Sequence, residues 1–169
     1  MAAVVQGVVL VGHGGVPKDC PPELISKLKR FEAQRRVGGT PQSAEERHLD
    51  ATIRRWPRTA ANDPYQSGLE AVGAALLPLL DGALFALAYN EFCAPTVEES
   101  IEELISLGAT HITVATTMFT PGGAHSEIEI PETLARLRPK HPGVELHYAW
   151  PFDVRLIAET LRQQVRRFS

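Results

Sequence analysis

The chain has 169 residues, 44% of them hydrophobic, which is enough to bury one apolar core without disulfides or a structural metal. Its two cysteines, Cys20 and Cys93, form no Cys-x-x-Cys pair, so we expect no four-thiolate zinc site and no iron–sulfur cluster. No stretch approaches the roughly 20 apolar residues of a membrane helix. We therefore expect a single domain over residues 1 to 169, in a reducing, cytoplasmic setting and with no membrane partner.

The net charge of −3 is distributed unevenly along the chain. Between Lys27 and Arg58 there are nine basic and four acidic residues, a local charge of +5, which leaves −8 elsewhere. A basic patch on an acidic protein favours an anionic ligand over nucleic acid, so we expect no nucleic-acid partner. The alternative interpretation is a solvated helical face.

The first predicted element is a buried strand at residues 4 to 11, which ends at Gly12-His13-Gly14-Gly15. An insertion at about residues 17 to 62 follows, in which two polar helices are predicted at about 22 to 36 and 43 to 55. Each has only a thin apolar stripe. Because so long a connection between regular elements is uncommon, we expect it to act as a lid or in oligomerisation.

Strands and helices alternate regularly after the insertion. Further strands are predicted at 83 to 89, 112 to 117 and 144 to 150, as short apolar runs typical of parallel strands buried on both faces. Helices are predicted from Asp63 to 80, from Thr96 to Gly108 and from Asp153 to 168. Before the last strand, Pro131 conflicts with a helix begun at Ser126, so a turn through residue 129 and a short helix from Pro131 are predicted.

This alternation predicts an α/β fold: a four-stranded parallel sheet with helices on both faces, a flavodoxin-like half, with a helical insertion after the first strand. Ligands of such sheets bind outside the carboxyl ends of the strands. The first, second and third strands run into loops that carry His13, Glu91 and His125. Two histidines and a carboxylate are a common ligand set for transition metals.

Each of these residues also has a simpler interpretation. His13 alone is more often a histidine bonded to its own loop, and only His125 on a second loop makes a shared site about equally probable. Glu91 is a candidate general base, a role typically worth about 10²- to 10⁴-fold in rate, or it caps the helix after residue 95. Glu127 and Glu129 either assist His125, by orienting it or by receiving protons, or are ordinary first-turn acids.

Two other enzyme classes are disfavoured by the motifs. His13-Gly14-Gly15 is similar to the oxyanion-hole loop of an α/β hydrolase, but the chain has no Gly-x-Ser-x-Gly nucleophile elbow. The dinucleotide fingerprint that Gly12-x-Gly14 begins has Pro17 in place of its third glycine.

Three motifs together resemble those of the class II metal chelatases, above all the small sirohydrochlorin cobaltochelatases and ferrochelatases of cobalamin and sirohaem synthesis. They are Val9-Leu10-Val11-Gly12-His13-Gly14, then Glu91-Phe92-Cys93-Ala94-Pro95-Thr96-Val97-Glu98-Glu99, and Gly122-Gly123-Ala124-His125 with Glu129-Ile130-Pro131. The resemblance covers residues 3 to 15 and 83 to 168. Each motif alone is weak, whereas their order and spacing together are specific.

The resemblance implies a chelatase-like fold and a lyase that inserts a divalent metal into a tetrapyrrole without nucleotide, with Co²⁺ favoured and Fe²⁺ or Ni²⁺ as alternatives. It implies that His13 and His125 bind the metal, that Glu91 assists as a third catalytic residue, and that short members pair as homodimers. Many relatives have Ser and Arg where this chain has Gly15 and Val16. The expected substrate contacts are Gly14, Gly15, Phe119, Arg54 and Arg55. The alternative is a carrier of metal or tetrapyrrole that does not catalyse insertion.

Overall fold

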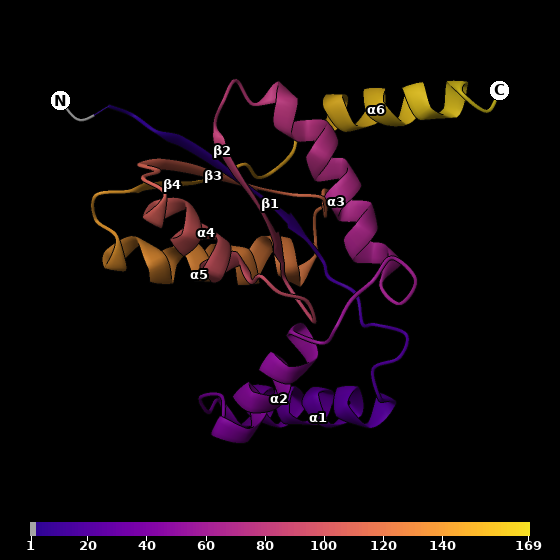
Figure 1. The fold of residues 1–169 in the computed structure, drawn as a ribbon, viewed down its shortest axis with the longest axis vertical. Helices are drawn as coiled ribbons and strands as arrows, with labels where there is room; N and C mark the ends of the chain where they lie inside the picture. Colours follow the sequence, from indigo (N-terminus) through magenta and orange to yellow (C-terminus); the bar gives the residue numbers. More distant parts are fainter. Residues whose placement is uncertain (1–2) are drawn as a thin grey trace.

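Four parallel strands form the centre of the computed structural model, which describes residues 3–169 (Figure 1). The strands are β1 (Gln6–Gly12), β2 (Leu84–Tyr89), β3 (His111–Thr116) and β4 (Glu145–Tyr148). Their order is β2-β1-β3-β4, and every neighbouring pair is parallel. The predicted parallel α/β sheet is therefore confirmed, with β1 in its interior.

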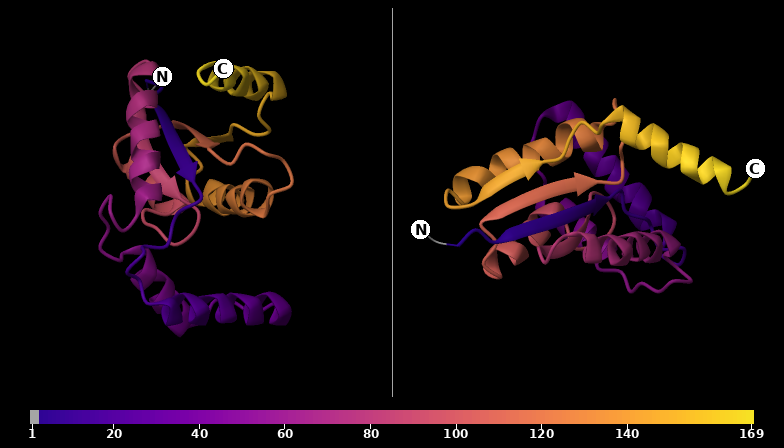
Figure 2. Two further views of the ribbon diagram at one scale, coloured as in Figure 1. Left: turned by 90° about the vertical axis from the view of Figure 1, so that its right-hand side faces the viewer. Right: turned by 90° about the horizontal axis from the view of Figure 1, so that it is seen from above.

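Helices cover both faces of this sheet (Figure 2). The covering helices are α3 (Pro64–Leu76), α4 (Val97–Ser106) and α5 (Ile130–Leu137), with short 3₁₀ turns at η1 (Leu77–Leu79) and η3 (Arg138–Lys140), and α6 (Val154–Arg166) follows β4. On one face, Val9 packs with Ile101 of α4 and Leu134 of α5. On the other, Leu10 packs with Leu69 of α3. Because successive strand residues point to opposite faces, β1 is buried on both sides.

The segment before α5 differs from the prediction. Instead of a turn through Glu129, a π-helical turn, η2 (His125–Glu129), leads directly into α5, and the N–H of Ile130 donates to the carbonyl of His125. In a regular helix, the ring of Pro131 would clash with the carbonyl four residues earlier. The wider π turn accommodates the proline. The chain is therefore helical from His125 onward.

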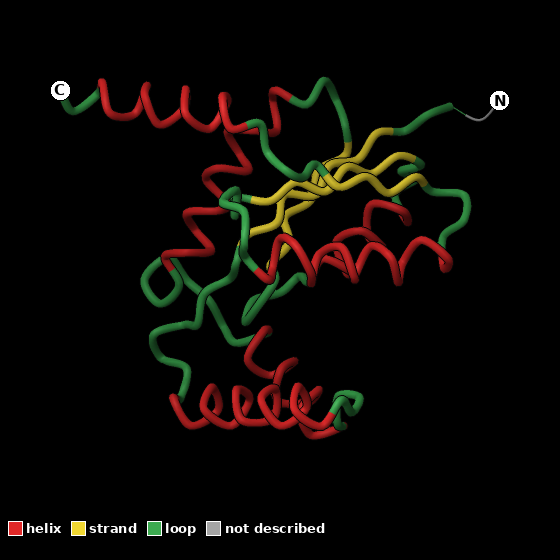
Figure 3. The backbone as a smooth tube through the Cα atoms, turned by 180° about the vertical axis from the view of Figure 1, so that it is seen from behind, coloured by secondary structure: helices red, strands yellow, loops and turns green. Residues whose placement is uncertain are grey.

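The insertion forms α1 (Pro22–Gly38) and α2 (Ala44–Arg54), as predicted, and these helices lie apart from the sheet beyond its carboxyl edge (Figure 3). Ser43 accepts a hydrogen bond from the N–H of Glu46 and caps α2. One small apolar cluster joins the two helices to the rest of the chain: Cys20, Leu28, Leu49, Ile53 and Phe92. Phe92 follows β2, so the insertion is attached at the loop after that strand.

Two arginines near the end of the insertion, Arg54 and Arg58, form hydrogen bonds with the loop after β2. Arg54 donates to the carbonyls of Asn90 and Cys93, at 3.1 Å each. Arg58 donates to the carbonyls of Gly15 and Phe92 and forms an ion pair with Asp63, the N-cap of α3. The Arg58 and Asp63 side chains are only 6% and 1% exposed. Arg58 thus joins the loops after β1 and β2 to the start of α3.

The last helix, α6, extends away from the sheet (Figures 1 and 2). Within the described part of the chain, none of its residues is buried. Its apolar side chains lie in solvent, among them Val154, Leu161 and Val165. Over residues 3–169, no helix combines the length and the apolar character that crossing a membrane requires.

Replacing Arg58 by Met should lower the free energy of unfolding by about 3–5 kcal/mol, because the buried Asp63 carboxylate loses its counter-ion. The matched control is Arg55→Met, which breaks a pair with Glu99 whose side chains are 69% and 43% exposed. Such surface pairs contribute about 0–1 kcal/mol. Urea denaturation followed by circular dichroism measures both variants, and equal losses would contradict a structural role for the buried pair.

Candidate metal centre

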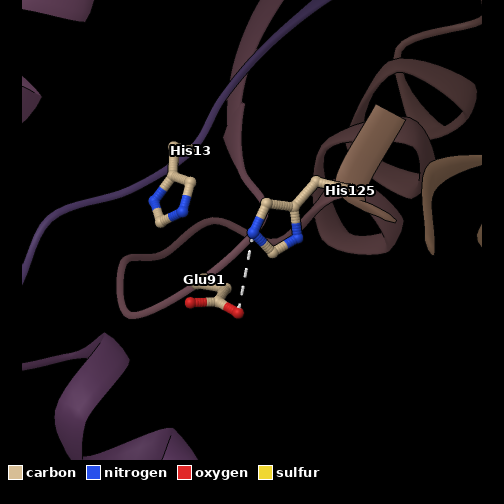
Figure 4. Close-up of side chains that lie close together, drawn as sticks. All are labelled: His13, Glu91 and His125. Carbon is tan, nitrogen blue, oxygen red and sulfur yellow. Dashed lines mark ion pairs between the residues drawn. The ribbon is translucent and has the colours of Figure 1, made fainter. Parts of the chain in front are cut away.

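His13, Glu91 and His125 meet at the carboxyl edge of the sheet (Figure 4). One ligand atom from each lies within 4.8 Å of the others. The two imidazole rings are 4.8 Å apart between centroids and nearly perpendicular, at 81°. The three residues come from the loops after β1, β2 and β3. The predicted convergence of these side chains at one sheet edge is what the structure shows.

The loops after β1 and β2 run in contact because the pairing of the two strands continues beyond their ends. The N–H of Asn90 donates to the carbonyl of Gly12 at 2.9 Å, and that of Glu91 to the carbonyl of His13 at 2.8 Å. Gly14 follows with φ +101°, and a Cβ added there would lie 1.8 Å from the Glu91 carbonyl oxygen. Only glycine permits this approach, and the approach holds His13 beside Glu91.

Local hydrogen bonds orient the ring of His13. Its backbone N–H donates to the hydroxyl of Tyr65 at 2.7 Å. Its Nδ1 lies 2.8 Å from the carbonyl oxygen of Gly14. Because a carbonyl only accepts, Nδ1 carries the proton of the neutral ring, and Nε2 keeps the lone pair that a metal needs.

His125 is oriented in the same way by different partners. Its Nδ1 lies 2.9 Å from Oε2 of Glu129, one helical turn later. The amide Nδ2 of Asn90 donates to that carboxylate oxygen at 2.6 Å and lies 2.7 Å from Nδ1. With the Nδ1 proton directed to this carboxylate, Nε2 keeps the lone pair that can bind a metal, and it lies 3.8 Å from Oε1 of Glu91. Of the two interpretations of Glu129, the geometry supports orientation of His125.

Glu127 has a separate local contact. Its Oε1 accepts a hydrogen bond from the N–H of Gly122 at 2.9 Å, which closes the glycine loop before His125. Gly122 has φ +94°, a conformation that glycine adopts readily. Glu127 therefore shapes the loop that presents His125.

The arrangement offers two neutral imidazole nitrogens and one carboxylate oxygen, which suits cobalt, iron, nickel, copper or zinc. The nearby thiol of Cys93 is a poor additional ligand, since burial raises its pKa to about 11 and keeps it protonated. Burial also raises the pKa of Cys20. A first-row transition metal held by histidine and carboxylate fits the site.

The expected substrate contacts have other neighbours as well. Gly15 lies against Asp63 and Tyr65, and Phe119 packs edge-on against Phe152, at 6.4 Å between ring centroids. Phe119 also lines a groove of about 410 Å³ along α6. Arg54 directs its guanidinium to Asp50 and to loop carbonyls, whereas Arg55 is largely exposed. Contact of these residues with a tetrapyrrole stays a prediction.

Sequence reasoning missed three residues that position the site: Asn90, Tyr65 and Arg58. Asn90 had a signal, since it is a polar residue at the end of a buried strand next to Glu91. Tyr65 and Arg58 had none, because a first-turn tyrosine and one arginine in a basic stretch both look solvated. Their contacts depend on packing between distant segments.

Substitution of Gly14 by Ala should weaken Co²⁺ binding by about 10- to 100-fold, the usual effect of disturbing residues that support metal ligands. The new Cβ would overlap the Glu91 carbonyl and separate the two loops. Gly39→Ala is the control, since Gly39 also has positive φ, +60°, but has no atom within 4 Å of an added Cβ. It should cost about 1 kcal/mol of stability and leave the affinity unchanged. Visible absorbance of bound Co²⁺ measures the affinity, and similar values for both variants would contradict the steric argument.

Comparison with known proteins places these features in a family. The sequence matches the CbiX family over residues 61–168, more than half of the chain. The sirohydrochlorin ferrochelatase of Priestia megaterium is 32% identical over 75 residues, which are 44% of this chain and 28% of that protein. The sirohydrochlorin ferrochelatase of Bacillus subtilis (strain 168) is 31% identical over 68 residues, 40% of this chain and 26% of that protein. The matched segments thus cover between a quarter and a third of the length of these curated relatives.

A solved structure shares the fold. It is the sirohydrochlorin chelatase SirB from Bacillus subtilis subspecies spizizenii in complex with cobalt, with a TM-score of 0.53 and 19% sequence identity over 86% of this chain and 42% of that chain. The family match and the curated relatives confirm the expected family, class II chelatases of the sirohydrochlorin type. The chain belongs to the CbiX family.

Proposed function

We propose that this protein inserts a divalent metal into sirohydrochlorin or a related tetrapyrrole, without nucleotide, in biosynthesis of the cobalamin or sirohaem type. The observation that carries the proposal is the convergence of two imidazole Nε2 atoms and the Glu91 carboxylate at one sheet edge. The names of the curated relatives, both sirohydrochlorin ferrochelatases, support the substrate class.

Cobalt is the metal that we propose, with iron or nickel as alternatives. The similar SirB chain was solved in complex with cobalt, and two imidazoles with one carboxylate suit all three ions. Three protein donors leave coordination positions open for water and then for pyrrole nitrogens. The metal is a substrate, so moderate affinity favours its transfer to the macrocycle.

The chemistry of insertion assigns a role to each residue. The metal sheds water while His13 and His125 hold it through Nε2, and the macrocycle loses two pyrrole protons. Glu91 lies 3.8 Å from His125 and is the carboxylate that would accept the two pyrrole protons one at a time and pass each to solvent water. Glu129 and Asn90 keep Nε2 of His125 directed into the site.

The acidic substrate is expected to approach past the insertion. Sirohydrochlorin carries several carboxylates, and the segment from Lys27 to Arg58 has a charge of +5. Arg55 is 69% exposed, and we propose that it exchanges its surface partner Glu99 for a substrate carboxylate, while Arg54 shapes the adjacent loop. Gly14, Gly15 and Phe119 complete the proposed substrate contacts.

We propose a homodimer in which the apolar side of α6 is covered by a second copy. Val154, Leu161 and Val165 recur on one side of this helix and are more than half exposed. The similar SirB chain is more than twice as long as the part this chain covers, so two copies would supply a comparable length. The two free thiols are consistent with a cytoplasmic setting, and we propose one domain for the chain.

Purified protein mixed with sirohydrochlorin and Co²⁺ should accelerate metal insertion above the spontaneous rate, followed by the absorbance change of the macrocycle. Fe²⁺ and Ni²⁺ in parallel reactions, and then in competition, rank the metals. Binding of metal or macrocycle without acceleration would favour a carrier and would overturn the enzymatic proposal.

His13→Ala and His125→Ala should each lose most insertion activity, and Glu91→Gln should lower the rate by about 10²- to 10⁴-fold. All three side chains are at least partly exposed, so melting temperatures should change little. His147→Ala, which alters an exposed histidine on β4, is the control and should retain activity. A large loss of stability in the first three variants would make those residues structural.

Leu161→Glu should shift the protein from dimer to monomer, because it places a charge on the apolar side of α6. Arg155→Glu is the control, since it makes a larger change of charge on the polar side of the same helix. Light scattering after size-exclusion chromatography gives the mass of each variant. A wild-type protein that stays monomeric at high concentration would contradict the proposed dimer.

A further inference from the structure

Lys29 of α1 reaches into the metal centre from the insertion. Its Nζ lies 3.3 Å from Oε2 of Glu91, while the other oxygen of the same carboxylate faces Nε2 of His125. The ammonium also lies 3.4 Å from Oε2 of Glu32 and 4.7 Å from the centroid of the Phe92 ring. One carboxylate of the candidate centre is therefore already paired with a cation of the protein.

We propose that Lys29 is a positioning residue that holds Glu91 in the metal-free centre and is displaced when a divalent metal binds. The inference rests on the proposed metal centre but not on insertion activity. A metal bound to Glu91 would bring two positive charges close to the ammonium, and the two cations would repel each other. A metal at Oε1 therefore disfavours Lys29 at Oε2 of the same carboxylate, and this competition lowers the affinity of the site.

The displaced ammonium has partners nearby. Glu32 lies one turn later on α1 and already forms an ion pair with Lys29. The face of Phe92 offers a further attraction for a cation. The Lys29 side chain is 47% exposed, so the ammonium also stays accessible to water. The contacts of Lys29 with Glu32 and Phe92 do not depend on its ion pair with Glu91. The exchange of lysine for metal at Glu91 therefore costs little and is reversible.

The same exchange assists release of the metal. When the metal passes to the macrocycle, Glu91 would remain as a partly buried carboxylate without a counter-ion, which is unfavourable. The return of Lys29 restores a cation at Oε2. Lys29 therefore keeps the metal from binding too tightly for transfer, and it links α1 to the occupancy of the centre.

The test is Co²⁺ titration of the full chain, with Kd taken from calorimetry or visible absorbance, for four proteins. They are the wild type, Lys29→Met, Lys29→Arg and Lys27→Met. Lys29→Met should bind Co²⁺ about three- to tenfold more tightly, as expected from losing one partly exposed competing charge. Lys29→Arg retains the cation and should restore wild-type affinity.

Lys27→Met is the matched control, because it removes the same charge two residues away on α1, where Lys27 pairs with Glu45. It should leave Kd close to the wild-type value. The gap between Lys29→Met and the wild type should narrow as salt is raised, since salt screens partly exposed charges. A merely structural lysine would not give tighter binding on removal.

Unchanged or weaker Co²⁺ binding by Lys29→Met would overturn the proposal, as would equal tightening by Lys27→Met. Absence of Co²⁺ binding in all four proteins would overturn it together with the metal centre. Failure of the sirohydrochlorin assay alone would leave it standing, because the titration contains no macrocycle. A melting curve for each variant confirms that the folded protein is being compared.

Discussion

The site depends on the close passage of two loops at Gly14. The backbone of Gly14 runs against the carbonyl of Glu91 so closely that no side chain fits between them. This contact extends the β1–β2 pairing past the ends of the strands and fixes the separation of His13 and Glu91. Tyr65 and Asp63, at the start of α3, support the same loop from the other side. The pairing of β1 with β2, the start of α3 and the positions of His13 and Glu91 thus depend on one another.

Arg58 extends this arrangement to the insertion. Its side chain is buried and bonds to two of the three ligand-bearing loops, those after β1 and β2, and its pairing with Asp63 links those loops to α3. Arg54 and the ring of Phe92 add further attachments to the loop after β2. Although α1 and α2 lie apart from the sheet, they are joined to the chain next to Glu91. The insertion is therefore attached to the two loops that carry His13 and Glu91.

The fold and the three central residues were predictable because each depends on local patterns. Short apolar runs identified the strands, and the carboxyl-edge rule then placed His13, Glu91 and His125 together without knowledge of their distances. The capping box of Thr96 and Glu99 was also visible in the sequence and is present. These features require only the order of residues within a segment.

The remaining features depend on contacts between segments. Asn90 reaches His125 and Glu129 across 35 and 39 residues, and no spacing rule predicts such pairs. The rules for α-helices predict a break before Pro131. The chain forms a π turn there instead, whose wider hydrogen-bonding pattern tolerates the proline. Lys29 belonged to a basic stretch that looked solvated, and only the placement of α1 brings it to Glu91.

The strand order has a consequence for the size of the centre. His13 follows the middle strand of the trio β2-β1-β3, and its partners follow the strands on either side. Neighbouring strands lie about 4.8 Å apart, so β2 and β3 are separated by about twice that distance, yet the three ligand atoms lie within 4.8 Å of one another. Bonds of about 2.0–2.2 Å to one ion would place two donors at most about 4.4 Å apart, so a small contraction suffices. The reach of the three side chains, rather than the strand spacing, therefore brings the donors together, and a slight closing of the loops would complete the approach to one ion.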